Sequence, residues 1–147
     1  MRSCELFTKP LVTFEGRWHK IPDAGLKPLP VQRPIPIWFG GREDRALERT
    51  ARLADGWMTN FRSLDEGKAS IEKFRALLEK YNRTLNQCPI EVRIPYGDGK
   101  PETWRAQIKT WVESGVNYIS LNTMNAGFKH ASEHLRAVKQ FAQATMK

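Results

Sequence analysis

Residues 34–58 read Pro-Ile-Pro-Ile-Trp-Phe-Gly-Gly-Arg-Glu-Asp-Arg-Ala-Leu-Glu-Arg-Thr-Ala-Arg-Leu-Ala-Asp-Gly-Trp-Met, and this stretch decides the fold. It predicts a short apolar strand, a glycine pair, an amphipathic helix and then a second strand. Two glycines at the end of a strand let the backbone approach a ligand closely. The helix that follows offers free N–H groups and the positive end of its dipole to an anion. The stretch therefore predicts a strand–loop–helix–strand unit with room for a phosphate.

Strand and helix patterns alternate four times after residue 34. The predicted strands are 35–39, 56–60, 91–96 and 117–122, and the predicted helices are 43–54, 65–82, 101–114 and 131–144. Ser63 and Asp65 are alternative N-caps of the second helix, and Gly56 suits a left-handed turn after the first. Regular βα alternation predicts a parallel sheet with right-handed crossovers.

The predicted strand at 91–96 distinguishes between two kinds of parallel sheet. Val92 and Ile94 are apolar, whereas Glu91 and Arg93 are charged. An open sheet with helices on both faces disfavours this alternation. A barrel wall fits it, because one face packs on helices and the other faces the barrel interior. The sequence thus predicts an α/β fold that is a partial, half TIM-type βα barrel with about four parallel strands and four helices. A small open α/β sheet is the alternative.

Two segments are expected along the chain. Residues 35–147 form the half-barrel, and residues 1–34 form an irregular N-terminal segment with a hairpin-like part at 12–21. In that hairpin, Phe14 and Trp18 are expected to cover one side of a core. No run of about 18 apolar residues is present, and the start of the chain lacks the apolar region of a signal peptide. A cytoplasmic protein with no membrane contact is therefore expected.

Composition argues against several kinds of site. The net charge is +8, but the 24 Lys and Arg are mixed with 16 Asp and Glu, which disfavours nucleic-acid binding. Cys4 and Cys88 form no CxxC pair. His130 and His134 are four residues apart on a predicted helix face, which we interpret as a polar face, so no metal is expected.

Ligands of parallel α/β folds bind at the carboxyl ends of the strands. Three of the four loops there contain glycine, at 40–42, 97–100 and 122–127. This placement predicts a phosphorylated ligand. Arg42 directly follows the glycine pair and could neutralise a phosphate through a bidentate contact. Alternatively, Arg42 is a surface residue beside the acidic Glu43 and Asp44.

Several segments together resemble the luciferase-like monooxygenase family. In order they are Val12-Thr-Phe-Glu-Gly-Arg-Trp, Leu29-Pro-Val-Gln-Arg-Pro-Ile-Pro-Ile, Phe39-Gly-Gly-Arg, Ala54-Asp-Gly-Trp and Gly115-Val-Asn-Tyr-Ile-Ser-Leu-Asn-Thr-Met-Asn-Ala-Gly. The resemblance runs from about Phe7 to Phe141 and is to the second half of the family's barrel. It implies flavin- or deazaflavin-dependent oxidation or reduction of a small-molecule substrate.

The resemblance also implies where a cofactor binds. In relatives the loop at Gly40 and Gly41 contacts the cofactor phosphate, and many carry Ser or Thr shortly after it, where this chain has Glu43 and Asp44. FMN is the expected cofactor, with a deazaflavin as the alternative. The candidate cofactor-binding residues are Gly40, Gly41, Arg42, Asn122, Thr123 and Gly127. No catalytic residue is assigned, because most residues around the flavin ring belong to the first half of such a barrel.

The expected function is that of a flavin-dependent (luciferase-like) oxidoreductase or monooxygenase, with this chain supplying the cofactor-phosphate half of the barrel. Two alternatives remain: a truncated, non-catalytic remnant that folds or dimerises without cofactor, and a basic nucleic-acid-binding module. A half-barrel exposes two strand edges and an apolar sheet face to water. We therefore expect a homo-oligomer or a complementing half-barrel.

Overall fold

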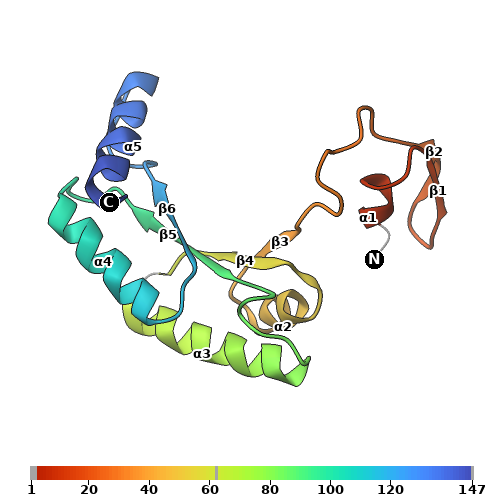
Figure 1. The fold of residues 1–147 in the computed structure, drawn as a ribbon, viewed down its shortest axis with the longest axis horizontal. Helices are drawn as coiled ribbons and strands as arrows, with labels where there is room; N and C mark the ends of the chain where they lie inside the picture. The colour runs from red at the N-terminus through yellow and green to blue at the C-terminus, as the bar shows by residue number, and fades with distance from the viewer. Residues whose placement is uncertain (1–2, 62, 147) are drawn as a thin grey trace. The chain divides into compact units, whose positions relative to one another are not determined.

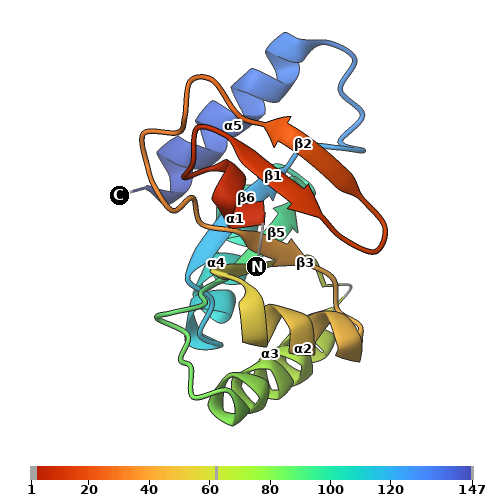
Figure 2. The same ribbon diagram turned by 90° about the vertical axis from the view of Figure 1, so that its right-hand side faces the viewer.

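The computed structural model describes residues 3–61 and 63–146, and the chain divides into two compact units, Met1–Ile37 and Trp38–Lys147. The N-terminal unit contains the short helix α1 (Ser3–Leu6) and an antiparallel hairpin of β1 (Val12–Glu15) and β2 (Lys20–Ala24), visible in Figures 1 and 2. The N–H of Gly16 donates to the carbonyl of His19 at 2.9 Å and closes the turn.

One expectation for this hairpin is wrong. Trp18 lies on the turn with 77% of its surface exposed, so it covers no core. The guanidinium of Arg17 lies 4.5 Å from the centre of the Trp18 ring, which is a cation–π contact within the turn. Val12 is the buried side chain of the hairpin.

The C-terminal unit alternates strand and helix throughout. Its elements are β3 (Trp38–Gly40), α2 (Asp44–Leu53), β4 (Gly56–Thr59), α3 (Leu64–Lys80), β5 (Ile90–Pro95), α4 (Pro101–Glu113), β6 (Tyr118–Asn122) and α5 (Ala131–Thr145). The strands pair in the order β3-β4-β5-β6, and every pair is parallel. The predicted α/β fold with a partial TIM-type barrel is confirmed. Among the described residues, no helix is both long and apolar enough to span a membrane.

One face of the four-stranded sheet packs against the helices (Figure 1). The ring of Trp57 in β4 lies 4.7 Å from that of Phe74 in α3, centre to centre, and both side chains are fully buried. The same core contains Leu47, Ile71, Leu78, Ile90, Val92, Ile94 and Trp111. Burial of these apolar side chains is the main stabilising contribution to the unit.

The opposite face of the sheet curls inward. Met58, Glu91 and Tyr118 share this face, because Met58 is paired with Glu91 and Glu91 with Tyr118 in the parallel register. The rings of Trp38 and Tyr118 lie 5.6 Å apart, although they belong to the two edge strands. In a flat sheet those strands would be separated by about 14 Å, at about 4.8 Å per neighbouring pair. The contact is that of a curved barrel wall.

Two local predictions are resolved by this geometry. Ser63, not Asp65, is the N-cap of α3, and its hydroxyl accepts a hydrogen bond from the N–H of Glu66 at 3.2 Å. Gly56 is not the left-handed residue we expected. It starts β4, and a Cβ there would lie 2.3 Å from the ring of Trp38. Glycine is needed at position 56 because the indole of Trp38 occupies the space that a Cβ would take.

Candidate cofactor site at the carboxyl end of the sheet

The β3–α2 loop is fixed on one side and open on the other. Gly41 has φ 108°, a conformation that favours glycine, and its carbonyl accepts a hydrogen bond from Nε1 of the buried Trp57 at 2.8 Å. At Gly40, an added Cβ would meet only the carbonyl oxygen of Met58, at 3.8 Å. The backbone of this loop is therefore held rigidly from the core side, while Gly40 leaves space for a ligand.

The helix that follows this loop has no side-chain cap. Glu43 is the N-cap of α2, but its side chain makes no capping hydrogen bond. The first intrahelical bonds run from the N–H groups of Ala46 and Leu47 to the carbonyl of Glu43. The N–H groups of the preceding turn thus have no partner within the helix and receive no capping bond from the Glu43 side chain. This is the arrangement in which a helix start attracts an anion.

Charged side chains around this loop are paired with α3. Arg42 contacts Glu66 at 2.5 Å between Nη1 and Oε1, and Asp44 pairs with Lys73. Arg42 is thus paired with Glu66 of α3. Because Lys73 neutralises Asp44, the acidic residues at the start of α2 oppose an anion less than their number suggests.

The β6–α5 loop is shaped by its own polar side chains. Oδ1 of Asn122 accepts a hydrogen bond from the N–H of Met124 at 2.9 Å, and Oγ1 of Thr123 lies 2.8 Å from Nδ1 of His134. Gly127 has φ 78°, and an added Cβ would meet nothing within 4 Å. Asn122 and Thr123 therefore hold the loop, and Gly127 borders open space.

The start of α5 differs from that of α2. Oε2 of Glu133 accepts hydrogen bonds from the N–H groups of Lys129 and His130, both at 2.8 Å. These two bonds hold the pKa of Glu133 below its usual value. A carboxylate therefore already occupies the anion position. His130 precedes α5 and is its N-cap, so the predicted helix face shared by His130 and His134 is wrong.

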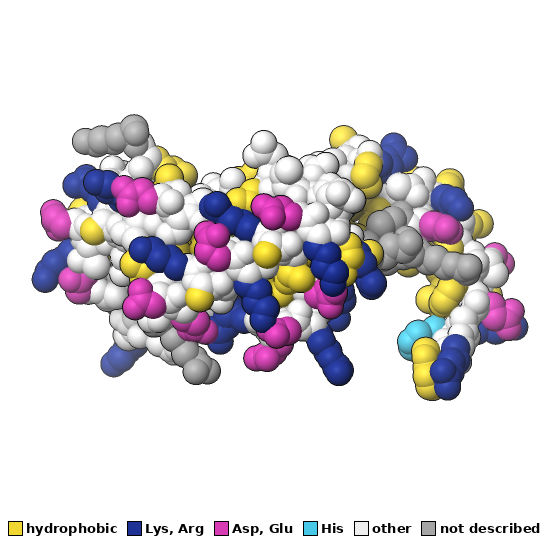
Figure 3. Space-filling view, turned by 90° about the horizontal axis from the view of Figure 1, so that it is seen from below, with side chains coloured by type: hydrophobic (Ala, Val, Ile, Leu, Met, Phe, Trp, Pro, Cys, Tyr) yellow, Lys and Arg dark blue, Asp and Glu magenta, His cyan; other side chains and the backbone are white. Residues whose placement is uncertain are grey.

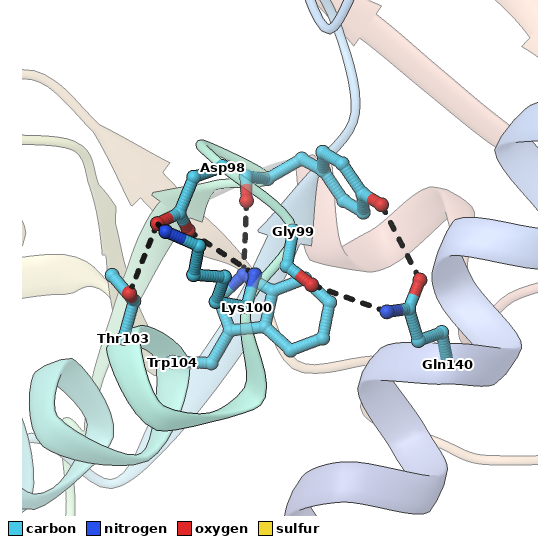
Figure 4. Close-up of polar contacts among 7 residues, drawn as sticks. Asp98, Gly99, Lys100, Thr103, Trp104 and Gln140 are labelled. Atoms are coloured by element: carbon cyan, nitrogen blue, oxygen red, sulfur yellow. Dashed lines mark hydrogen bonds and ion pairs between the residues drawn. The ribbon is translucent and has the colours of Figure 1, made fainter.

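The β5–α4 loop is closed by internal hydrogen bonds (Figure 4). Oδ1 of Asp98 accepts a hydrogen bond from the N–H of Lys100 at 3.1 Å, and Oδ2 accepts one from the hydroxyl of Thr103 at 3.3 Å. The N–H of Lys100 is the main reason that the pKa of Asp98 is lowered. This loop also has a carboxylate of its own beside the helix start.

Gln140 ties the β5–α4 loop to α5. Its Nε2 donates to the carbonyl of Gly99 at 3.1 Å, and its Oε1 accepts from the hydroxyl of Tyr96 at 3.3 Å (Figure 4). Nε1 of Trp104 donates to the carbonyl of Tyr96 at 2.9 Å, so a buried indole holds this loop as Trp57 holds the first. The β5–α4 loop is thus part of the scaffold.

The six predicted residues lie in two separate groups. Gly40 ends β3 and Gly41 and Arg42 follow it, whereas Asn122 ends β6 and Thr123 and Gly127 lie in the loop after it. β3 and β6 are the two edge strands of the sheet. The carboxyl ends of both strands point to the same edge of the sheet, and in the strand order β4 and β5 lie between them. The six residues thus follow the first and the last strand of the sheet.

Four supporting residues were not predicted as part of the site: Trp57, Glu66, His134 and Gln140. Trp57 had a usable signal, because an indole in a buried strand needs an acceptor for its N–H. Glu66 is 24 residues from Arg42, so no local sequence pattern indicates this contact.

Cys88 is buried, which raises the pKa of its thiol to about 11, so it is a core residue and not a nucleophile.

The four parallel strands, each followed by a helix, form part of a TIM-type barrel, and the candidate site lies at the carboxyl ends of these strands. A family model described as luciferase-like monooxygenase matches residues 4–97, and the chain belongs to this family. It is 38% identical over 94 residues to an uncharacterized protein of Mycobacterium tuberculosis, covering 64% of this chain and 31% of that protein. It is 35% identical over 72 residues to the FMNH2-dependent dimethylsulfone monooxygenase of Pseudomonas putida, covering 48% of this chain and 20% of the enzyme. The matches thus span about a third or less of these relatives.

Solved structures support the fold over a longer stretch. The coenzyme F420-dependent tetrahydromethanopterin reductase of Methanopyrus kandleri superposes with a TM-score of 0.74 at 13% identity, covering 97% of this chain and 59% of the reductase. An F420-dependent secondary alcohol dehydrogenase, solved with an F420–acetone adduct, gives a TM-score of 0.52 at 16% identity, covering 96% of this chain and 50% of that one. At such identities the likeness concerns the fold.

Proposed function

We propose that this chain forms the cofactor-phosphate half of a flavin-dependent oxidoreductase, with FMN as cofactor and the deazaflavin coenzyme F420 as the alternative. Family membership supports the chemistry, and the names of the relatives include one FMNH2-dependent and two F420-dependent enzymes. When bound, the flavin supplies the redox step, and the protein binds and orients it. The substrate is a small molecule.

The observation that carries this proposal is the β3–α2 loop. Gly40 leaves open space, Gly41 is held by Trp57, and the start of α2 has no side-chain cap. A phosphate fits such a place, because backbone N–H groups and the helix dipole bind it without a further side chain. Arg42, from the same loop, is the candidate side-chain donor to the phosphate, and its ion pair with Glu66 holds it in place while offsetting part of its charge.

We propose that the candidates of the β6–α5 loop, Asn122, Thr123 and Gly127, lie near a part of the cofactor other than its phosphate. Glu133 already accepts the N–H groups at the start of α5, so a phosphate there would meet a carboxylate. We therefore propose that Asn122 and Thr123 contact the cofactor away from its phosphate. Gly127 keeps that approach free of a side chain.

The barrel also has to be completed. Within the described residues, β3 pairs only with β4 and β6 only with β5, so both edges of the sheet are open. We propose that either a second copy or a complementing half-barrel pairs with these edges. Such a partner would also cover the curved face that carries Met58 and Tyr118.

The test is a titration of the purified chain with FMN and, separately, with F420, followed by flavin fluorescence. The decisive variant is Gly40→Asp, which places a carboxylate in the open space, and its matched control is Gly40→Ala, which fills the same space without charge. Saturable binding that is lost in Gly40→Asp and kept in Gly40→Ala supports the phosphate site.

Two other outcomes would favour the alternatives. A well-folded chain that binds neither cofactor would be the non-catalytic remnant. Binding to duplex DNA that weakens steeply with salt would favour the nucleic-acid-binding module. The face in Figure 3 gives this last reading little support, because Lys and Arg side chains there are interspersed with Asp and Glu.

A further inference from the structure

Helix α5 carries an apolar stripe that is largely exposed in the part of the chain that the structure describes. Leu135, Val138 and Ala142 follow one another at three- and four-residue steps, which places them on one side of the helix. Leu135 is 62% and Val138 48% exposed. Single exposed apolar residues are ordinary on protein surfaces, but an aligned stripe on a helix indicates a missing neighbour.

The stripe faces away from α4. The contacts of α5 with α4 and its loop come from Gln140, Phe141 and Ala144: the ring of Phe141 lies 5.2 Å from that of Trp104, and the carbonyl of Ala144 accepts a hydrogen bond from Arg105 at 2.9 Å. At 100° per residue, Leu135 and Val138 lie on the other side of the helix. The stripe thus points to where the next helix of the layer would lie.

The neighbouring strand is open on the same side. β6 pairs with β5 along one edge, and no strand of the described chain pairs with the other. Met124, just after the end of β6, is 72% exposed. An open parallel strand edge beside an apolar helix stripe is the surface that the next βα unit of a sheet buries.

We infer that this surface, the Leu135–Val138–Ala142 stripe with the open edge of β6, docks a βα unit of a complementing half-barrel whose helix presents an apolar stripe flanked by acidic side chains. This inference rests on the half-barrel role proposed above and names the surface and its partner. The reductase fold supports such an occupant, since almost all of this chain corresponds to only 59% of the reductase, which leaves about two fifths of that chain for further structure.

The charges around the stripe favour a complementing half-barrel over a second copy of this chain. The exposed charge beside the stripe is Lys139, four residues after Leu135, and the exposed Arg136 lies further round the helix. A second copy would bring its β3–α2 edge against this surface. The exposed charges of α2 are mainly Arg45, Arg49 and Arg52, while Asp44 and Glu48 already pair with Lys73 and Lys80. Like charges would face each other, which disfavours the second copy.

The probe is the part of the Mycobacterium tuberculosis relative that lies outside its matched 94 residues, co-expressed with this chain and analysed by sedimentation. We expect a 1:1 complex. Leu135→Lys with Val138→Lys should weaken it by roughly 30-fold or more, because two charges would be buried at the centre of the interface. The matched control, Asn86→Lys with Gln143→Lys, places the same two charges at exposed positions outside the stripe, one in the α3–β5 loop and one on α5, and should leave the complex unchanged.

Three results would overturn the inference: no complex, a complex indifferent to the stripe, or self-association of the chain alone that the stripe variant abolishes. Circular dichroism of both lysine pairs checks folding, which the exposure of all four positions should preserve. Assembly is measured without cofactor, and Gly40→Asp should assemble normally. Assembly without flavin binding would thus count against the proposed function alone, and flavin binding without assembly against this inference alone.

Discussion

The β3–α2 and β6–α5 loops look equivalent in sequence and differ in what occupies the helix start. Each follows an edge strand, contains a glycine with positive φ (108° at Gly41, 78° at Gly127) and leads into a helix. At α2 no side chain caps the helix, and Arg42 lies in the loop. At α5 the carboxylate of Glu133 lies beside the helix start and accepts the N–H groups of Lys129 and His130, the two residues before the helix. A glycine loop before a helix is an anion site only where the donors are still available.

The largest expected effect comes from removing the indole that holds the first loop. Trp57→Phe loses the hydrogen bond to Gly41 and leaves a small cavity, which should cost about 2–3 kcal/mol of unfolding free energy in urea. The matched control is Trp104→Phe, which loses the corresponding bond to Tyr96 from an equally buried position. Both variants should be destabilised, but only Trp57→Phe should weaken FMN binding. Equal losses of FMN affinity would mean that the two loops contribute alike.

The next effect tests the charge in the first loop. Arg42→Met should weaken FMN binding roughly ten- to hundredfold, the range for one charge-assisted hydrogen bond. Riboflavin, which lacks the phosphate, should bind both proteins equally. Arg45→Met is the control, an exposed arginine one turn further along. Stability should change little in either variant, because partly exposed ion pairs contribute about 0–1 kcal/mol. A parallel loss of riboflavin affinity in Arg42→Met would place Arg42 elsewhere on the cofactor.

A smaller effect is expected in the second loop. Thr123→Val keeps the shape of the side chain and removes the contact with Nδ1 of His134, which should cost about 1 kcal/mol of unfolding free energy. If Thr123 contacts the cofactor away from the phosphate, FMN and riboflavin should lose affinity by the same factor. A loss confined to FMN would move the phosphate to the β6–α5 loop and reverse our comparison.

The sequence predicts the repeating parts of this fold well. The four strands and four helices of the C-terminal unit appear where the apolar periodicity indicated, within a few residues at each end. Periodicity is a local property, so one segment suffices to reveal it. The hydrogen-bond partners of the loops are not local: Arg42 reaches Glu66, and Tyr96 reaches Gln140, 44 residues away. Such pairs follow from packing, which no single segment of the sequence encodes.

Gly56 and His130 are two residues whose structural roles were predicted wrongly from the sequence. Gly56 was expected to turn the chain, but its role is to let the ring of Trp38 cross β4. His130 was counted on a helix face, but it is the N-cap that directly precedes α5, which starts at Ala131 as predicted. Both errors concern a neighbour or a boundary, the two features that sequence patterns define least.

The smallest expected effect makes the α5 start resemble that of α2. Glu133→Gln removes the charge that interacts with the N–H groups of Lys129 and His130, so the variant should melt slightly below the wild type at pH 7. The pKa of Glu133 is depressed in the folded chain from its ordinary value of 4.5. Its stabilisation is therefore fully present above that value and is lost as the pH falls through the lower, folded pKa.

The difference in melting temperature between wild type and Glu133→Gln should consequently shrink as the pH falls from 7 to about 3. Glu102→Gln, in the first turn of α4, is the matched control, because it removes an exposed carboxylate at another helix start. A difference that stays constant over this range would show that Glu133 acts through its shape and not its charge. In that case the start of α5 would repel an anion no more than the start of α2 does, and the two loops would have to be distinguished by Arg42 alone.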